Sequence, residues 1–195
     1  EKVLQRLQRI QRAEQQCSDL IGALLLLSRN ERGQGTSNVA RVAEQLLDAH
    51  RAQLGGKPLE LLLEGERNLV IDAPEAALSV ALGNLIGNAV KYSGNREPAK
   101  IRVDYQPQPD GGHQFTVSDN GAGFDMAYAG KLFGVFQRLH KASDYPGTGI
   151  GLASVRRVLT RHGGRIWAEA EPDVGATFHF YLPPATDADK QGPSA

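Results

Sequence analysis

Two glycine clusters separated by a polar loop constrain this chain more than any other part of its sequence. The first cluster is Asp119-Asn120-Gly121-Ala122-Gly123, and the second is Gly147-Thr148-Gly149-Ile150-Gly151-Leu152. Glycine lets the main chain approach a ligand without an intervening side chain, and polar loops between such positions often carry binding residues. The pattern predicts a ligand held between the two clusters and a segment able to close over it.

Each cluster has a chemical interpretation. The alternation of apolar and polar residues over 113–118 predicts a strand that carries Asp119 at its carboxyl end. A carboxylate there can accept hydrogen bonds from an amino group, such as the exocyclic amine of adenine. The second cluster opens a helix predicted over 150–161, whose first N–H groups can meet phosphate oxygens. A turn and a flexible linker remain the alternatives for either cluster taken alone.

A helix predicted over 74–92 carries the second informative pattern. Its apolar face consists of Leu78, Ala81, Leu82, Leu85, Ile86 and Ala89. Its other side gathers two carboxamides, an ammonium and a phenol, from Asn84, Asn88, Lys91 and Tyr92. Carboxamide oxygens are suitable ligands for Mg²⁺, and a lysine can act as a point charge on a phosphate. An ordinary polar helix face remains the alternative for any one of these residues.

The other elements alternate between helix and strand. We expect one further helix over 38–54, and strands over 59–63, 69–72, 100–105, 113–118, 165–169 and 176–182. His162-Gly163-Gly164 ends the helix of the second glycine cluster, because a basic residue in the last turn followed by glycine is a typical stop. A chain of 195 residues is long enough for one such core and an appendage.

The appendage is predicted at the N-terminus. Apolar side chains alternately four and three residues apart form a heptad-like stripe that includes Val3, Leu7, Ile10, Cys17, Ile21 and Leu24. The stripe predicts one long helix, which needs partner helices from a second copy of the chain or from sequence before residue 1. Packing against its own globular domain is the alternative. The predicted organisation is a helix over 1–32, a globular domain over 36–184 and a polar tail over 185–195.

Composition excludes several classes of function. The 22 Lys and Arg residues balance the 22 Asp and Glu residues, so the chain has no net positive charge that would attract nucleic acid. A single cysteine excludes an internal disulfide and a cysteine-rich metal site, which fits a reducing compartment such as the cytoplasm. The apolar run over 24–27 is too short to span a bilayer, and we expect no membrane contact from this chain.

Four motifs, taken in order, resemble the N, G1, F and G2 boxes of the ATP-binding domain shared by sensor histidine kinases, gyrase-type topoisomerases, Hsp90 and MutL. They are the run from Asn84 to Ser93, the first glycine cluster, Leu132-Phe133-Gly134-Val135-Phe136, and the second glycine cluster. His162-Gly163-Gly164-Arg165-Ile166-Trp167 is similar to the histidine kinase branch, and Phe136-Gln137-Arg138-Leu139-His140 to its phytochrome-type and PAS-linked members. The predicted first helix resembles the second helix of the kinase dimerisation hairpin.

The resemblance implies a fold and a set of residue roles. The fold is an α/β two-layer sandwich of a mixed sheet and three helices, the Bergerat-type ATP-binding fold, preceded by a long coiled-coil-like helix. Asp119 is expected to accept from the adenine amine, Gly121 and Gly123 to shape the base pocket, and Tyr92 to pack against the nucleotide. Asn88, assisted by Asn84, is expected to ligate Mg²⁺, and Lys91 and Arg138 to contact the phosphates of ATP. The remaining nucleotide-binding positions are Phe133, Gly147, Thr148, Gly149, Gly151 and Leu152.

The implied function is transfer of the γ-phosphoryl group of ATP to a histidine and then to an aspartate of a response regulator receiver domain. The chain departs from the family in one respect, because none of its histidines, at 50, 113, 140, 162 and 179, stands in a phosphoacceptor box. We therefore expect a fragment of a longer, homodimeric kinase that does not phosphorylate itself. A degenerate kinase-like interaction module and a non-kinase ATPase of the same superfamily are the alternatives.

Overall fold

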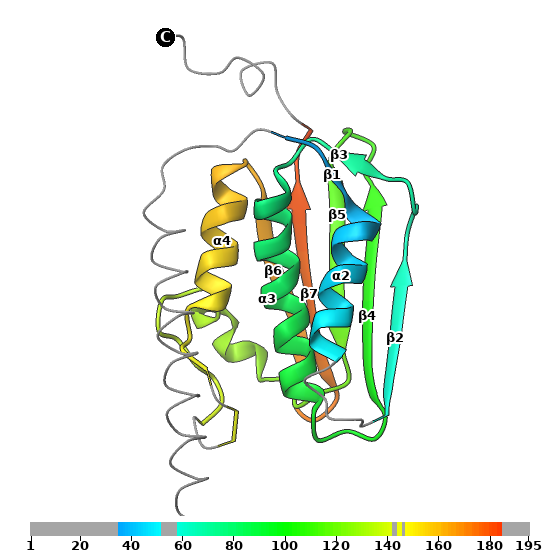
Figure 1. The fold of residues 1–195 in the computed structure, drawn as a ribbon. Helices are drawn as coiled ribbons and strands as arrows, with labels where there is room; N and C mark the ends of the chain where they lie inside the picture. The colour runs from blue at the N-terminus through cyan, green and yellow to red at the C-terminus, as the bar shows by residue number, and fades with distance from the viewer. Residues whose placement is uncertain (1–34, 52–57, 142–143, 146, 185–195) are drawn as a thin grey trace, which may run out of the picture.

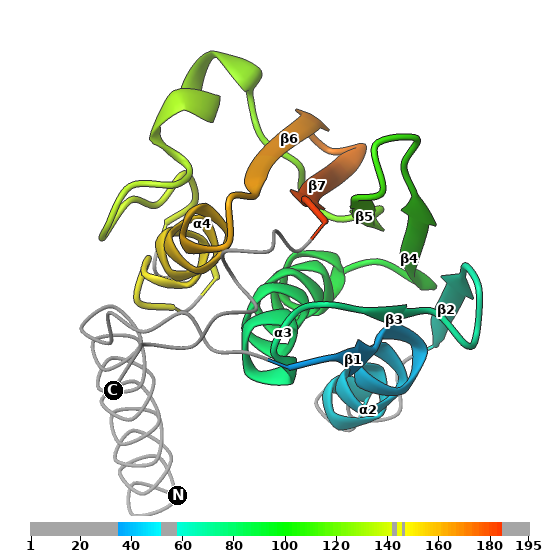
Figure 2. The same ribbon diagram turned by 90° about the horizontal axis from the view of Figure 1, so that it is seen from above.

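The structure is a computed structural model that describes residues 35–51, 58–141, 144–145 and 147–184. Within these residues, a five-stranded sheet carries a layer of three helices on one face (Figures 1 and 2). The strands, in their order across the sheet, are β2 (Leu59–Glu64), β4 (Ala99–Pro107), β5 (His113–Asp119), β7 (Gly175–Leu182) and β6 (Arg165–Glu171). The predicted α/β two-layer sandwich is confirmed.

The sheet is mixed, as predicted. β2 runs parallel to β4, and every other neighbouring pair is antiparallel. The predicted strand over 69–72 is shortened to β3 (Val70–Ile71) and lies outside this sheet, where it pairs with β1 (Ser37–Asn38). A crossover must join the parallel strands β2 and β4, and α3 (Glu75–Ser93) supplies it.

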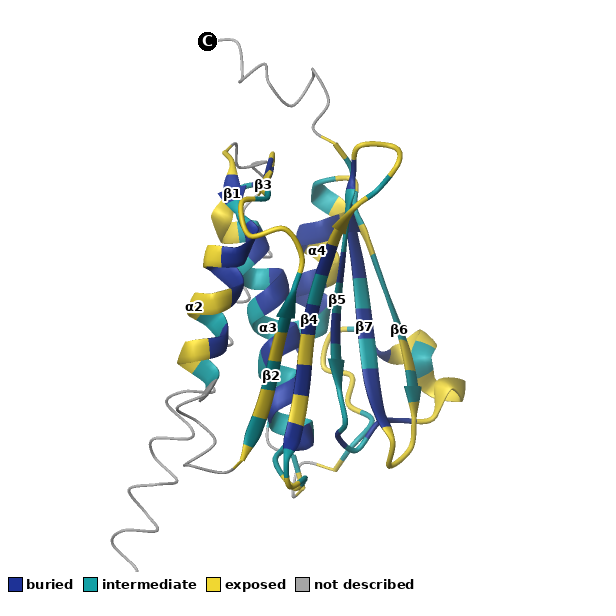
Figure 3. Ribbon diagram, turned by 90° about the vertical axis from the view of Figure 1, so that its right-hand side faces the viewer, coloured by how far each residue is buried: buried dark blue, intermediate teal, exposed yellow. Residues whose placement is uncertain are grey.

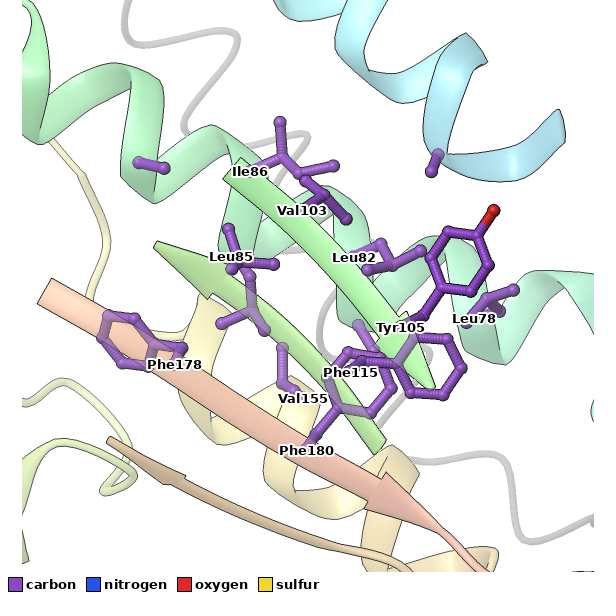
Figure 4. Packing of buried hydrophobic residues seen from close by; sticks show 14 of the residues in the cluster. Leu78, Leu82, Leu85, Ile86, Val103, Tyr105, Phe115, Val155, Phe178 and Phe180 are labelled. Carbon is purple, nitrogen blue, oxygen red and sulfur yellow. The ribbon is translucent and has the colours of Figure 1, made fainter. Parts of the chain in front are cut away.

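Helix α3 lies at the centre of the helical layer. It begins one residue later than predicted, after Pro74, which occupies the N-cap position. Glu75 in its first turn and Lys91 in its last turn complement the helix dipole. The predicted apolar face is confirmed, because each of its six members is at most 1 % exposed. Figure 4 shows the leucines of this face pointing toward the sheet.

The core lies between α3 and the strands. Along β4, Ile101, Val103 and Tyr105 are buried under the helices whereas Lys100 and Arg102 are exposed, the period of two expected of a sheet covered on one side (Figure 3). The rings of Phe115 on β5 and Phe180 on β7 stack with their centroids 4.4 Å apart (Figure 4). This stack joins the neighbouring strands β5 and β7 beneath the helical layer.

Helices α2 (Val39–Arg51) and α4 (Gly151–Arg161) flank α3. α2 begins one residue later than predicted, and the predicted positions 52–54 lie outside the described residues. A 3₁₀ helix, η2 (Met126–Lys131), was not predicted. The predictions for 1–32 and 185–195 also fall outside the described residues. In the part of the chain that the structure describes, no helix has the length and apolar character needed to cross a bilayer.

Candidate functional site

A cavity of about 270 Å³ lies among α3, the end of β5, the segment after the first glycine cluster and the start of α4. Its volume is near the lower end of the range for small-molecule sites. All predicted site residues except Gly121 and Phe133 line it. They are Asn84, Asn88, Lys91, Tyr92, Asp119, Gly123, Arg138, Gly147, Thr148, Gly149, Gly151 and Leu152. The structure therefore brings the strand-end carboxylate and the amide-bearing helix to one pocket.

Asp119 ends β5 on the side of the sheet that the helices cover, in register with Ile101 of β4 and Ala176 of β7. Its carboxylate accepts a hydrogen bond of 2.8 Å from the main-chain N–H of Gly121. Burial raises the pKa of Asp119 to about 6, against the opposing effect of the N–H groups of Gly121 and Ala176. At neutral pH the pocket therefore holds a desolvated, ionised acceptor.

Gly123 holds the loop after Asp119 in a conformation that a side chain would prevent. Its φ is +58°, and a Cβ at this position would lie 1.9 Å from the carbonyl oxygen of Glu171 at the end of β6. A Cβ at Gly121 would lie 2.6 Å from the carbonyl oxygen of Tyr92, which ends the α3 wall of the pocket. The loop is therefore pressed between the end of α3 and the turn that joins β6 to β7.

Asn84 and Asn88 belong to the α3 wall, one helical turn apart. The side-chain nitrogen of Asn84 donates to the carbonyl oxygen of Val80 at 2.8 Å, so its other atom, Oδ1, is the acceptor. A Cβ at Gly151 would lie 2.5 Å from this Oδ1, which shows how closely the α4 terminus approaches the amide. The wall therefore offers hard oxygen acceptors next to a helix N-terminus.

Two cations face the same pocket. Burial, and then the charge of Arg138, lower the pKa of Lys91 to about 8. The Lys91 ammonium lies 4.3 Å from the centre of the Tyr92 ring. Arg138 donates to the carbonyl oxygens of Gly147, at 2.6 Å, and Tyr145. A pocket with two cations of which one is desolvated favours an anionic ligand.

The N-terminus of α4 lines the same cavity as the two cations, through Gly151 and Leu152. Ile150 occupies the N-cap position, and no side chain caps the helix. Gly149, just before it, has a φ of +74°, and a Cβ at this position would lie 3.0 Å from the carbonyl oxygen of Gln137. The first N–H groups of α4 are thus placed where an anion can meet them.

His140 is a pocket residue that the sequence patterns did not single out for binding. Its Nε2 lies 2.9 Å from the carbonyl oxygen of Gly123, so Nε2 carries the hydrogen. Its ring centroid is 5.2 Å from those of Tyr92 and Tyr145, which are 4.9 Å from each other. Other lining residues not predicted are Phe124, Leu132, Gln137, Leu139, Ala176 and Phe178.

Gly121 and Phe133 are the two predicted residues that do not line the cavity. Gly121 supports Asp119 through the hydrogen bond described above. Phe133 is partly buried and packs against the hydrophobic core. By contrast Phe136, three residues later, is 66 % exposed and has a φ of +62°.

Comparisons with known proteins agree with this geometry. The family described as histidine kinase-, DNA gyrase B-, and HSP90-like ATPase matches residues 73–186, more than half of the chain. The phytochrome-like protein Cph1 of Synechocystis sp. is 40 % identical over 111 residues, which are 57 % of this chain and 15 % of Cph1. The phosphate regulon sensor protein PhoR of Pseudomonas aeruginosa is 31 % identical over 199 residues, which are 97 % of this chain and 44 % of PhoR. The chain thus spans less than half the length of either relative.

Solved structures share the fold. The crystal structure of full-length ShkA in complex with AMPPNP aligns with a TM-score of 0.73 at 25 % identity, covering 86 % of this chain and 36 % of ShkA. The mycobacterial sensor histidine kinase MprB aligns with a TM-score of 0.66 at 24 % identity, covering 76 % of this chain and 97 % of that one. The chain therefore belongs to the family of histidine kinase-, DNA gyrase B-, and HSP90-like ATPases, and it is homologous to sensor histidine kinases.

Proposed function

We propose that the cavity binds ATP with its adenine against Asp119 and its triphosphate toward Lys91 and the N-terminus of α4. The observation that carries the proposal is that a desolvated carboxylate, two cations and an uncapped helix N-terminus line one cavity. The carboxylate suits the amino group of a base, and the cations and N–H groups suit phosphates. ShkA, a structural relative, was crystallised with AMPPNP.

We also propose that Mg²⁺ accompanies the nucleotide and is held by Asn88, with Asn84 assisting. The donor set fits, because carboxamide oxygens are hard ligands and Mg²⁺ binds few protein atoms when phosphates are present. When bound, the ion neutralises charge that develops on the phosphate oxygens. Lys91 and Arg138 add positive charge on the same side, while Asp119 fixes the base and thereby the position of the γ-phosphate.

The activity that we propose is a protein histidine kinase. A nitrogen of an acceptor imidazole attacks the γ-phosphorus, the bond from that phosphorus to the bridging oxygen breaks, and ADP leaves with the electron pair. Positioning and charge neutralisation supply most of the rate for such a transfer. The homology to sensor kinases such as PhoR supports this reaction over hydrolysis alone.

We infer that the acceptor is a histidine other than the five of this chain. The ring of His140 is hydrogen-bonded to the carbonyl of Gly123 inside the pocket. His162 lies at the end of α4, where its ring is hydrogen-bonded to the carbonyl of Val158. The ring of His179 is hydrogen-bonded to the hydroxyl of Thr116 in the sheet. His50 is bonded to Leu46 within α2. His113 begins β5 and pairs with β4 and β7. The proposed domain limits are 36–184 for ATP binding and 1–32 for a dimerisation helix, with a response regulator receiver domain as the next partner in transfer.

Labelled ATP tests the proposal. Incubated alone with [γ-³²P]ATP and Mg²⁺, the chain should bind nucleotide but acquire no acid-labile, base-stable label. A purified dimerisation hairpin that carries an acceptor histidine should acquire such label when the chain is added, and not when an Asn88→Ala variant is added. Release of inorganic phosphate without any transfer would make the chain an ATPase, and the absence of nucleotide binding would make it an interaction module.

A further inference from the structure

We propose that Arg96 is a positioning residue that sets base selectivity by holding residues 119–123, which we call the base loop, from outside the pocket. The proposal rests on the function proposed above, in which Asp119 recognises the adenine amine. Arg96 lies in the connection between α3 and β4 and does not line the cavity. It would act on the ligand only through the loop.

The guanidinium of half-buried Arg96 binds three main-chain carbonyl oxygens. Its Nε donates to Asn120 at 2.9 Å, and its Nη2 donates to Gly121 at 3.1 Å and to Asp173. The first two acceptors belong to consecutive residues of the base loop, and Asp173 belongs to the turn between β6 and β7. One planar side chain therefore joins the base loop to the turn between β6 and β7.

The two bound carbonyls fix the direction of two peptide units. In a trans peptide the C=O and the N–H point to opposite sides. The carbonyl of Asn120, held outward by Arg96, shares its peptide unit with the N–H of Gly121, which donates to the Asp119 carboxylate at 2.8 Å. Arg96 thus aims the donor that orients the proposed base acceptor.

The next peptide unit repeats the arrangement. The carbonyl of Gly121 accepts from Arg96, and the N–H at the other end of that unit, from Ala122, donates to the carbonyl of Tyr92 at 3.2 Å. Tyr92 lines the same pocket. Loss of Arg96 therefore frees the carbonyl ends of both peptide units that join the base acceptor to the α3 wall, while the residues that face the phosphates keep their contacts.

Selectivity between ATP and inosine triphosphate (ITP) isolates this effect, because ITP carries an oxygen in place of the adenine amine. The wild-type chain should bind ATP more tightly than ITP in calorimetric titrations. We expect Arg96→Ala to narrow the ratio of the two affinities roughly tenfold, the factor for losing about one hydrogen bond to a charged group. Arg96→Lys keeps the charge but cannot reach three carbonyls in one plane, and it should narrow the ratio as well.

Arg102→Ala is the matched control. This arginine is exposed on the opposite face of the sheet, where it forms ion pairs with Glu64 and Asp104, and its removal should leave the ratio unchanged. An unchanged ratio of ATP to ITP affinity in Arg96→Ala or Arg96→Lys would overturn the proposal. An equal loss of affinity for both nucleotides would also overturn it, because that is the result expected if Arg96 has a merely structural role. A wild-type chain that binds ATP and ITP equally would instead overturn the base contact of the proposed function, and with it this proposal.

Discussion

Replacing Asp119 with asparagine should make the chain more stable and at the same time weaken its binding of ATP. The substitution keeps the size of the side chain and an oxygen that can accept from the N–H of Gly121. It removes the negative charge that burial disfavours and that the adenine amine is expected to need. A gain in stability together with a loss of function is the mark of a residue held in the pocket for a ligand.

The magnitude follows from the pKa of Asp119, which burial raises from 3.8 to about 6. Between these values the folded chain holds a proton that the unfolded chain has lost, so the free energy of unfolding falls as the pH rises. By neutral pH the ionised carboxylate costs the folded state about 3 kcal/mol, at ~1.36 kcal/mol for each unit of pKa. One carboxylate oxygen becomes an NH₂ group that cannot accept a hydrogen bond, so we expect a net gain of about 1–3 kcal/mol.

Urea and thermal unfolding without nucleotide, at pH values from 4 to 8, measure this gain. At pH 7.5 the melting temperature of Asp119→Asn should exceed that of the wild type by roughly 3–10 °C, and the difference should vanish near pH 4. Asp125→Asn is the control. Like Asp119, Asp125 accepts a hydrogen bond of 2.8 Å from the N–H two residues later, here that of Ala127. Because Asp125 is exposed, its replacement should bring no gain in stability. A variant of Asp119 that is less stable at pH 7.5, or that binds ATP with wild-type affinity, would refute the reasoning.

Three further predictions concern the other parts of the pocket. Asn88→Ala should abolish the tightening of ATP binding by Mg²⁺ in calorimetric titrations; equal tightening would place the ligand of the ion elsewhere. ATP binding at pH 8 should take up as much as about half a proton, because phosphate oxygens favour the charged form of Lys91, whose pKa burial lowers to about 8. Titrations in buffers of different ionisation enthalpy measure the uptake, and Lys91→Gln should remove it. Gly123→Ala should lower the free energy of unfolding by more than about 2 kcal/mol, because a Cβ would lie 1.9 Å from the carbonyl oxygen of Glu171; unfolding in urea checks this.

Periodicity predicted the elements that carry the motifs. The apolar face of α3 and the alternation of β5 are local patterns, so the sequence alone could assign Asp119 to a strand end and Asn88 to a helix side. These two side chains meet only because α3 packs against the sheet. Periodicity could not predict this packing, whereas the resemblance of four ordered motifs to a known family could. The predicted two-layer arrangement of a mixed sheet and three helices followed from that resemblance.

The residues that sequence reasoning missed are those whose partners lie far along the chain. Ala176 and Phe178 line the pocket because β7 pairs with β5 in a register that sets Ala176 beside Asp119. No nearby residue marks Arg96, whose carbonyl partners lie 24 to 77 positions away. Within one motif, Phe133 packs against the core whereas Phe136 is 66 % exposed. Because both residues are phenylalanine, the residue type alone could not predict this difference in burial.

The pairing of β7 with β5 also has a consequence for the order of events during synthesis. The motifs that resemble nucleotide-binding boxes are complete by Leu152, yet Ala176 and Phe178, which help to line the cavity, are made more than twenty residues later. A nascent chain that has emerged only as far as α4 would therefore carry all four of these motifs without a finished pocket. Competence for the ligand should appear abruptly, once the last strand has left the ribosome and has been added to the sheet.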